Sequence, residues 1–322
     1  MEDSPTGQLY PVSRIVVCGV EGVVGGNLAL GLAGRGVVHG LSFHQPVALE
    51  GCTTATCRRY EAGDLQRQVA AASPHWIVHC GPLARGSWDL PPDSAPADRE
   101  GALCVALAEI ADRAGARLTV ISTDAVFAGP RMFHDEQSSA ASAAPFALAA
   151  RRVEQVLAGR PRVLVVRTHA YGWSPRAAEP GFAERLWQHL AEGTPCRLDP
   201  HSHATPILAT DLAEPLWLAY RRGMEGLYHV AGAERTSAYR FAVELAACFG
   251  LPIGPGVMAD EEGAGLLRET SLSTRRAQRE LERPMPMLRE GLERFARQAT
   301  SGFRARLRSH APGSGGVRSV AA

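Results

Sequence analysis

The segment GVEGVVGG, residues 19–26, spaces its glycines in a way that suits phosphate binding. Its first, fourth and seventh residues are glycine, it follows an apolar β-branched run, and it opens a segment of helical spacing. Glycines at such a turn let the backbone approach a ligand closely, and the N-terminus of the helix offers unpaired N–H groups to an anion. The pattern predicts a cradle for a dinucleotide pyrophosphate. Its expected contacts are Gly19, Gly22, Val23, Val24 and Gly25.

The end of the second predicted strand bears on the choice of cofactor, because an acidic residue there commonly binds the ribose 2′-hydroxyl of NAD. This chain has Ser42, Phe43 and His44 at that point and no carboxylate. The serine suits a 2′-phosphate, and His44, Arg58 or Arg59 could pair with one, unless these residues simply face water. We therefore expect NADP, with NAD as the alternative. Further cofactor contacts are expected from Asp64 and Leu65, at the adenine edge, and from Cys80 and Gly81.

Groups that could move a proton are few. All 34 residues counted as lysine or arginine are arginine, so no amine side chain can form a Schiff base or lower a neighbour's pKa. Thr123 ends a buried strand, and Tyr171 is a candidate for facing the nicotinamide, with a role as a wall residue as the alternative. The loop at 134–136 carries His, Asp and Glu and could reach a substrate, although a solvated loop is the alternative. The histidines at 201 and 203 have no third ligand of suitable spacing, so we predict no metal site.

Strands and helices must alternate to position these residues. Apolar runs predict strands at 13–19, 37–43, 75–81, 117–123 and 162–168. Helical spacing marks the segments 25–36, 65–72, 97–115 and 142–157. Nearly all-apolar strands that alternate with helices predict a Rossmann-like, doubly wound parallel sheet in the α/β class.

After residue 168 the regular alternation of strands and helices gives way to helices separated by proline-rich, irregular connections, which suggests a domain boundary. We expect an NAD(P)-binding domain over 1–168 and a smaller, mostly helical substrate domain over 169–300, with 226–232 as a strand that could rejoin the sheet. Residues 301–322 have charge and glycine but no sustained apolar face, so we predict a disordered basic tail there.

The composition argues against several classes of protein. The net charge of +1 favours neither nucleic acid nor a membrane surface as partner. No apolar run approaches the ~20 residues that span a bilayer, and MEDSPTGQLY is unlike a signal peptide. Seven cysteines without a C-x-x-C pair indicate reduced thiols in a cytoplasmic protein.

The order of the motifs along the chain resembles the extended short-chain dehydrogenase/reductase superfamily. Within it the chain is most similar to the dTDP-4-dehydrorhamnose reductase family of sugar-nucleotide reductases, over about residues 13 to 298. The motifs are GVEGVVGG, GDL, ISTDAVFAG, RTHAYG, TPILATDLAEPLW, GLYHVAGAERTS and RETSLSTRRAQREL. The resemblance implies an NAD(P)-dependent oxidoreductase or epimerase-like protein that acts on a nucleotide sugar.

The resemblance breaks at the residues that would carry the reaction. It implies that Thr123 assists the carbonyl, and it aligns the family's Y-x-x-x-K pair with Phe146 and Ala150. Asp98 stands for the family's asparagine and Ala125 for the tyrosine of S-T-D-Y. Phenylalanine cannot donate a proton and alanine cannot tune a phenol, and losing a positioned acid costs roughly 10²–10⁴ in rate. We expect the helix to keep its backbone, so that Phe146→Tyr with Ala150→Lys would fold normally.

Two functions of different class follow. The first is an NAD(P)-binding protein that modifies a nucleotide sugar in carbohydrate or secondary-metabolite biosynthesis with a non-standard proton donor. The second is a catalytically silent cofactor-binding subunit that regulates or scaffolds a partner enzyme. The sequence leans toward the first. It leaves open the sugar, whether there is turnover, and whether the chain forms a homodimer or joins a partner.

Overall fold

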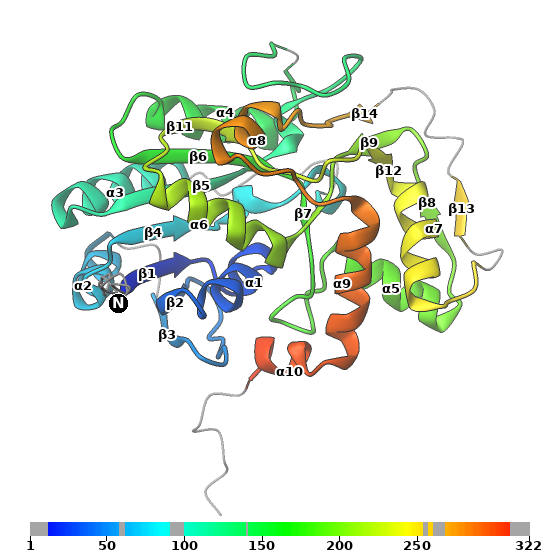
Figure 1. Ribbon diagram of the computed structural model, residues 1–322, viewed down its shortest axis with the longest axis horizontal. Helices are drawn as coiled ribbons and strands as arrows, with labels where there is room; N and C mark the ends of the chain where they lie inside the picture. Colours follow the sequence, from blue (N-terminus) through cyan, green and yellow to red (C-terminus); the bar gives the residue numbers. More distant parts are fainter. Residues whose placement is uncertain are drawn as a thin grey trace, which may run out of the picture.

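The computed structural model describes residues 12–57, 62–90, 100–139, 141–253, 257–259 and 268–309. Its centre is a parallel sheet of seven strands in the order β11-β6-β5-β4-β1-β2-β3, which Figure 1 shows edge to edge. The strands are β1 Ser13–Cys18, β2 Gly36–Ser42, β3 Thr53–Thr56, β4 Trp76–His79, β5 Arg117–Thr123, β6 Val163–Thr168 and β11 Gly226–His229. The Rossmann-like prediction is confirmed, as is the return of 226–232 to the sheet.

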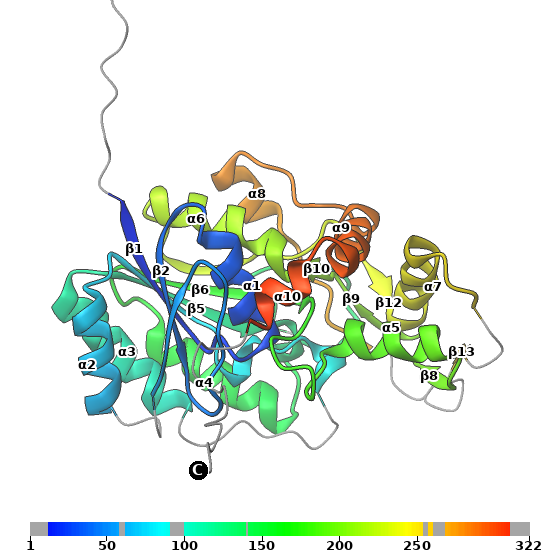
Figure 2. The same ribbon diagram turned by 90° about the horizontal axis from the view of Figure 1, so that it is seen from below.

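Side-chain alternation along the strands builds two hydrophobic layers. In β1, Ile15 and Val17 face one layer while Val16 and Cys18 face the other. The first layer packs under α1 Val23–Leu32 and α6 Ala213–Arg221, and the second under α2 Ala62–Ala72, α3 Glu100–Ala114 and α4 Pro145–Leu157. Figure 2 shows α6 and α2–α4 on opposite sides of the sheet. The doubly wound arrangement therefore buries both faces, as the nearly all-apolar strands require.

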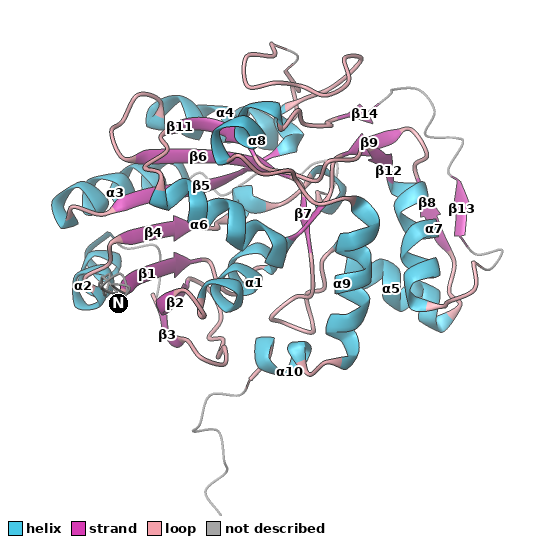
Figure 3. Ribbon diagram, viewed as in Figure 1, coloured by secondary structure: helices cyan, strands magenta, loops and turns pink. Residues whose placement is uncertain are grey.

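The C-terminal part is smaller and mostly helical, as Figure 3 shows. Its helices are α5 Phe182–Glu192, α7 Ala238–Phe249, α8 Arg275–Leu281, α9 Leu288–Thr300 and α10 Phe303–Leu307. Its short strands pair as β7 Ala170–Tyr171 with β10 Ile207–Leu208, β9 Ser202–Ala204 with β12 Thr236–Ser237 and β14 Arg268–Glu269, and β8 Cys196–Leu198 with β13 Val257–Ala259. Single 3₁₀ turns are η1 Pro82–Ala84, η2 Ser87–Asp89, η3 Asp124–Val126 and η4 Ala209–Leu212.

Among the elements of the main sheet and its neighbouring helices, the strand β3 and the helix α8 were not predicted from the sequence, and neither were the short strands of the C-terminal part. The tail prediction also needs correction, because residues 303–307 form α10 and Leu307 is fully buried. The Glu50 N–H donates to the carbonyl of Arg306, and the Ser309 hydroxyl donates to the carbonyl of Ala48. Residues 310–322 lie outside the described part of the chain. None of the described helices is both long and apolar enough to cross a bilayer.

The C-terminal segment is anchored by a buried ion pair. Arg308 donates to the Glu184 carboxylate at 2.6 Å and to the carbonyl of Ser174, and the Glu184 side chain is 1% exposed. We expect Arg308→Gln to lower the free energy of unfolding by about 2 kcal/mol, because a buried carboxylate loses a charged hydrogen bond. Urea denaturation measures the change.

The matched control is Arg306→Gln. Arg306 pairs with Glu50, and the two side chains are 47% and 62% exposed. A pair this exposed contributes at most about 1 kcal/mol. Equal effects of the two substitutions would contradict the anchoring role of Arg308.

Candidate functional site

A cavity of about 730 Å³ runs along the carboxyl ends of β1, β2 and β4 and extends to the C-terminal part. This is the place where an open α/β sheet with this strand order binds ligands. The Rossmann side contributes the glycine turn and the segments after β2 and β4, and the C-terminal side contributes residues between 170 and 185. The C-terminal lining is Ala170, Ser174, Arg176, Glu179, Pro180, Gly181 and Arg185.

The glycine turn has the backbone geometry of an anion cradle. Gly19 has φ +81°, and a Cβ on it would lie 2.1 Å from the carbonyl oxygen of Cys80. A Cβ on Gly25 would lie 2.2 Å from the carbonyl oxygen of Gly19. Gly22 is different, since its nearest neighbour would be 3.5 Å away. The first turn of α1 has neither a side-chain cap nor an acidic residue, which leaves its N–H groups for a ligand and fits a pyrophosphate.

Six of the ten predicted cofactor residues line this cleft, and four do not. The lining includes Gly19, Gly22, Val23, Val24, Cys80 and Gly81, whereas Gly25 packs behind the turn. Ser42 is 1% exposed and its hydroxyl lies 3.0 Å from that of Thr56. Asp64 pairs with Arg67 in the first turn of α2, and Leu65 is fully buried in the core. Ser42, Asp64 and Leu65 therefore do not line the cleft. Arg58 and Arg59 lie outside the described residues.

A carboxylate does lie at the end of β2, although the sequence prediction placed none there. Glu21 Oε1 accepts hydrogen bonds from the backbone N–H of Phe43 at 2.8 Å and of His44 at 3.3 Å. All three residues line the cleft. Sequence reasoning looked for an acid on the strand itself, whereas the turn after β1 supplies it. The signal available was that Glu21 is the acidic residue within the glycine segment.

The two positions that the resemblance aligns with a tyrosine–lysine pair do not line the cleft. Phe146 is 4% exposed and Ala150 is fully buried, both within the hydrophobic layer that also contains Val126 and Val153. No residue of α4 is among the described residues that line the cleft. The helix keeps its backbone as expected, but a lysine at 150 would have to enter the core. Asp98, the third departure, lies outside the described residues.

Thr123 is present at the end of β5, but its hydroxyl is already engaged. The side chain is fully buried. Its Oγ1 donates to the carbonyl of Arg85 at 2.7 Å and accepts from the N–H of Ala125 at 3.0 Å. The loop after β4 therefore covers the hydroxyl that the resemblance assigns to the substrate carbonyl.

Tyr171 belongs to the core rather than to the cleft. It is 3% exposed, and its ring packs edge-on against Phe241 and Phe295 at centroid distances of 5.0 and 5.8 Å. Its hydroxyl has no hydrogen-bond partner among the described residues, and burial raises the pKa of that phenol well above its ordinary value. A phenol so placed cannot serve as the proton donor.

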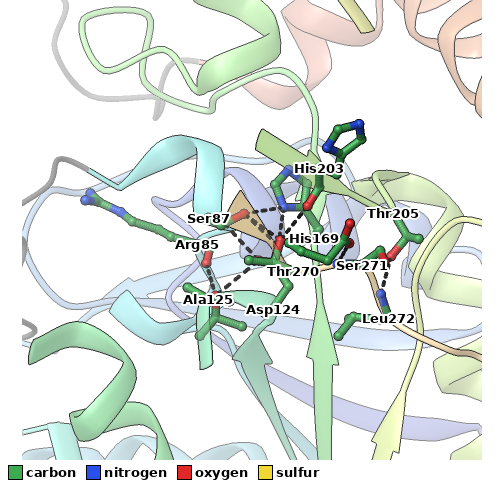
Figure 4. A network of polar contacts seen from close by, with 12 residues as sticks. Arg85, Ser87, Asp124, Ala125, His169, His203, Thr205, Thr270, Ser271 and Leu272 are labelled. Atoms are coloured by element: carbon green, nitrogen blue, oxygen red, sulfur yellow. Dashed lines mark hydrogen bonds and ion pairs between the residues drawn. The ribbon is translucent and has the colours of Figure 1, made fainter. Parts of the chain in front are cut away.

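Asp124 organises a polar network beside the cleft (Figure 4). The carboxylate is fully buried; Oδ1 accepts from the N–H of Ser87 at 2.8 Å, and Oδ2 accepts from the hydroxyls of Ser87 and Thr270 and from His169 Nδ1. The His169 Nδ1 to Oδ2 distance is 2.8 Å. Burial alone would raise the pKa of Asp124, but His169 and the two hydroxyls hold it below its usual value.

This network fixes the loop between β4 and α3 across the end of β5. Trp88 on that loop lines the cleft and packs on the His169 ring at a centroid distance of 4.5 Å. The same indole contacts Phe182 and Phe241 of the C-terminal part. His169 thus lies directly beneath the cleft wall, adjacent in sequence to the lining residue Ala170. The sequence predicted roles for Thr123 and Tyr171. Asp124, which follows Thr123, and His169, two residues before Tyr171, were not predicted.

The loop at 134–136 lies away from the cleft. His134 is fully buried and stacks on Phe127 at a centroid distance of 4.2 Å, and Glu136 accepts from the N–H of His229. Asp135 and Glu136 instead border a separate cavity of about 600 Å³ next to α8. The expectation that this loop reaches the substrate therefore does not agree with the structure.

Within the described residues, one cluster has donor atoms close enough for a metal ion, namely His79, Glu100 and Cys104. Here His79 Nε2 lies 2.8 Å from Glu100 Oε1, and both side chains are buried. Burial lowers the pKa of His79, but the adjacent Glu100 carboxylate raises it well above 6.5 overall. The cluster is accordingly a buried ion pair. It packs directly beneath Gly81 of the cleft lining, since a Cβ on Gly81 would lie 2.2 Å from Glu100 Oε1.

Comparisons with known proteins agree with this geometry. The family model described as RmlD substrate binding domain matches residues 13–301. No curated protein matches the chain.

Solved structures with the same fold are numerous. A dTDP-4-dehydrorhamnose reductase from Bacillus anthracis in complex with NADP is 20% identical, with 89% of this chain and 98% of that chain covered and a TM-score of 0.69. A hypothetical dTDP-4-dehydrorhamnose reductase from Sulfolobus tokodaii is 20% identical over 83% and 94% of the two chains, with a TM-score of 0.68. The UDP-glucose 4-epimerase of Thermotoga maritima with UDP-glucose is 17% identical over 90% and 99%, with a TM-score of 0.70.

The closed environment of α4 can be tested with a lysine scan. We expect Ala150→Lys to lower the free energy of unfolding by on the order of 3 kcal/mol or more, since it places an unpaired ammonium in an apolar layer. The burial of Ala150 thus argues against the expectation that restoring the tyrosine–lysine pair would leave folding unchanged. Thermal or urea denaturation provides the measurement.

The control is Ala149→Lys on the same helix, at a position that is partly exposed. Its cost should stay under about 1 kcal/mol, because its ammonium can reach water. A fully stable Ala150→Lys variant would show that the α4 face is open to the cleft, contrary to the structure.

Proposed function

We propose a function from the premise that this chain belongs to the RmlD substrate binding domain family: it binds NAD(P) and modifies a nucleotide sugar, with a proton donor other than the missing tyrosine. The observation that carries this proposal is one continuous cleft. It joins the glycine turn of the Rossmann part to an arginine-bearing wall of the C-terminal part. A cofactor and a second anionic ligand could therefore lie side by side.

The Rossmann end of the cleft supports cofactor binding. The turn at Gly19–Gly22 leaves room above Gly22 and presents the uncapped N–H groups of α1 to a pyrophosphate. The segments Phe43–His44 and Cys80–Pro82 form the walls on either side. A nicotinamide bound there would supply or accept the hydride.

The other end of the cleft supports a nucleotide sugar. Arg85, Arg176 and Arg185 contribute to its lining, and guanidinium groups suit the oxygens of a diphosphate. Similar solved structures are described with UDP-glucose or as enzymes of dTDP-sugars. Seven free cysteines suit a reducing compartment, so we include a cytoplasmic location in the proposal.

His169 is our candidate for the proton donor. Its Nδ1 is hydrogen-bonded to the Asp124 carboxylate, which orients the ring. Its Nε2 is then the nitrogen available for exchange, next to Trp88 and Ala170 of the cleft lining. The loop that carries Trp88 must shift for His169 to reach a substrate.

The second candidate is a silent cofactor-binding subunit. It is favoured by the engaged Thr123 hydroxyl, which donates to Arg85 beneath the closed loop, and by the burial of Phe146 and Ala150. In that case the chain would keep the cradle for binding and would report cofactor occupancy to a partner enzyme. Turnover separates the two candidates.

The test is cofactor oxidation with a panel of nucleoside diphosphate 4-keto sugars. We expect the wild-type protein to bind NADH or NADPH by calorimetry and to oxidise it with at least one sugar. His169→Asn keeps a donor toward Asp124, so cofactor affinity should be unchanged while turnover falls by roughly 10²–10⁴. Gly22→Asp should fold and lose cofactor binding, because its carboxylate would enter the pyrophosphate space.

Gly34→Asp is the matched control for Gly22→Asp, since Gly34 is exposed and has nothing within 4 Å of an added Cβ. It should bind cofactor normally. Cofactor binding without turnover on any sugar would favour the silent subunit, and no cofactor binding by the folded wild-type protein would refute both candidates.

A further inference from the structure

The carboxylate of Glu21 lies where a Rossmann protein reads the adenosine ribose. It is in the glycine turn, but its side chain crosses to the segment that follows β2 and lines the cleft beside Phe43 and His44. Glu21 is 9% exposed. An acidic group at the end of β2 is the feature that selects a free ribose hydroxyl.

The two oxygens of this carboxylate have different surroundings. Oε1 accepts from the N–H groups of Phe43 and His44 and lies 3.4 Å from the His44 ring nitrogen Nδ1. Oε2 is buried and has no hydrogen-bond partner among the described residues. The backbone bonds at Oε1 hold the group in place, and Oε2, which is closed off from solvent in this conformation, is the acceptor that a small shift of the cleft wall would open to a ligand. A buried acceptor without a donor is unfavourable, and a hydrogen bond from a ligand hydroxyl would remove that cost.

The chemistry of Oε2 discriminates between the two cofactors. An ionised carboxylate accepts hydrogen bonds only, so it pairs with a ribose hydroxyl but not with a phosphate dianion. A 2′-phosphate brings a charge of about −1.5 to −2 next to a carboxylate with little access to water, where repulsion is poorly screened. The geometry therefore opposes NADP at this point.

We propose that Glu21 makes this chain selective for NAD(H) over NADP(H), by accepting a hydrogen bond from an adenosine ribose hydroxyl at Oε2 and repelling a 2′-phosphate. The inference rests on the proposed function, because it assumes that the cleft binds a dinucleotide. It reverses the preference for NADP that the residues of β2 suggested, since Ser42 is turned into the protein and Glu21 takes its place at the cleft.

The experiment compares the dissociation constants of NADH and NADPH by calorimetry or by cofactor fluorescence. We expect the wild-type protein to bind NADH at least tenfold more tightly. Glu21→Gln keeps an acceptor for the Phe43 N–H but removes the charge, so NADPH should bind more tightly than in the wild type and the preference should fall to about threefold or less. Equal melting temperatures of the two proteins will confirm that the variant is folded.

Glu179→Gln is the matched control, because Glu179 lines the same cleft at its C-terminal end, where it pairs with Arg176. Removing that charge should leave the NADH to NADPH ratio unchanged. Tighter or equal binding of NADPH by the wild type, or an unchanged ratio in Glu21→Gln, would overturn this inference and leave the proposed function standing. Binding of neither cofactor would overturn the proposed function and this inference together.

Discussion

The arrangement around the cleft depends on how one buried carboxylate is satisfied. A carboxylate as deeply buried as Asp124 is costly unless its oxygens are well hydrogen-bonded, and here Ser87, His169 and Thr270 supply the donors. These residues come from the loop after β4 and from the positions that directly follow β6 and β14. The hydrogen bonds that satisfy this one carboxylate therefore join the Rossmann part to the C-terminal part. It also determines where Trp88 and the cleft wall lie.

Cofactor binding and proton donation are separable in this fold because different elements carry them. The cradle depends on backbone geometry at Gly19 and Gly22, where a side chain would collide or would enter the ligand space. The proton donor that the resemblance implies would be a side chain of α4, and here Phe146 and Ala150 belong to the hydrophobic layer. A chain without lysine can therefore keep cofactor binding, while proton donation passes to another group or is lost.

The strands and the glycine turn were predictable from the sequence, whereas the directions in which side chains point were not. Apolar strand runs and the glycine spacing identified the sheet, the cradle and the return of β11, because each is a property of a contiguous segment. Ser42 and Tyr171 failed because whether a strand residue faces the cleft or the core depends on neighbours distant in sequence. Glu21 was missed because it follows β1 in the sequence, whereas its side chain accepts hydrogen bonds from the residues after β2. The helix α10 was missed because a buried partner, Glu184, stabilises it from far away in the chain.

Asp124 holds the loop after β4 across the end of β5 through its hydrogen bonds to Ser87. Amide hydrogen exchange at Ser87 tests it most directly, since that N–H donates to Asp124 Oδ1 at 2.8 Å. We expect slow exchange at Ser87 in the wild-type protein and exchange at least tenfold faster in Asp124→Ala, with the amides of β1 equally protected in both. A Ser87 amide that exchanges in the wild-type protein as fast as an exposed loop amide would contradict it.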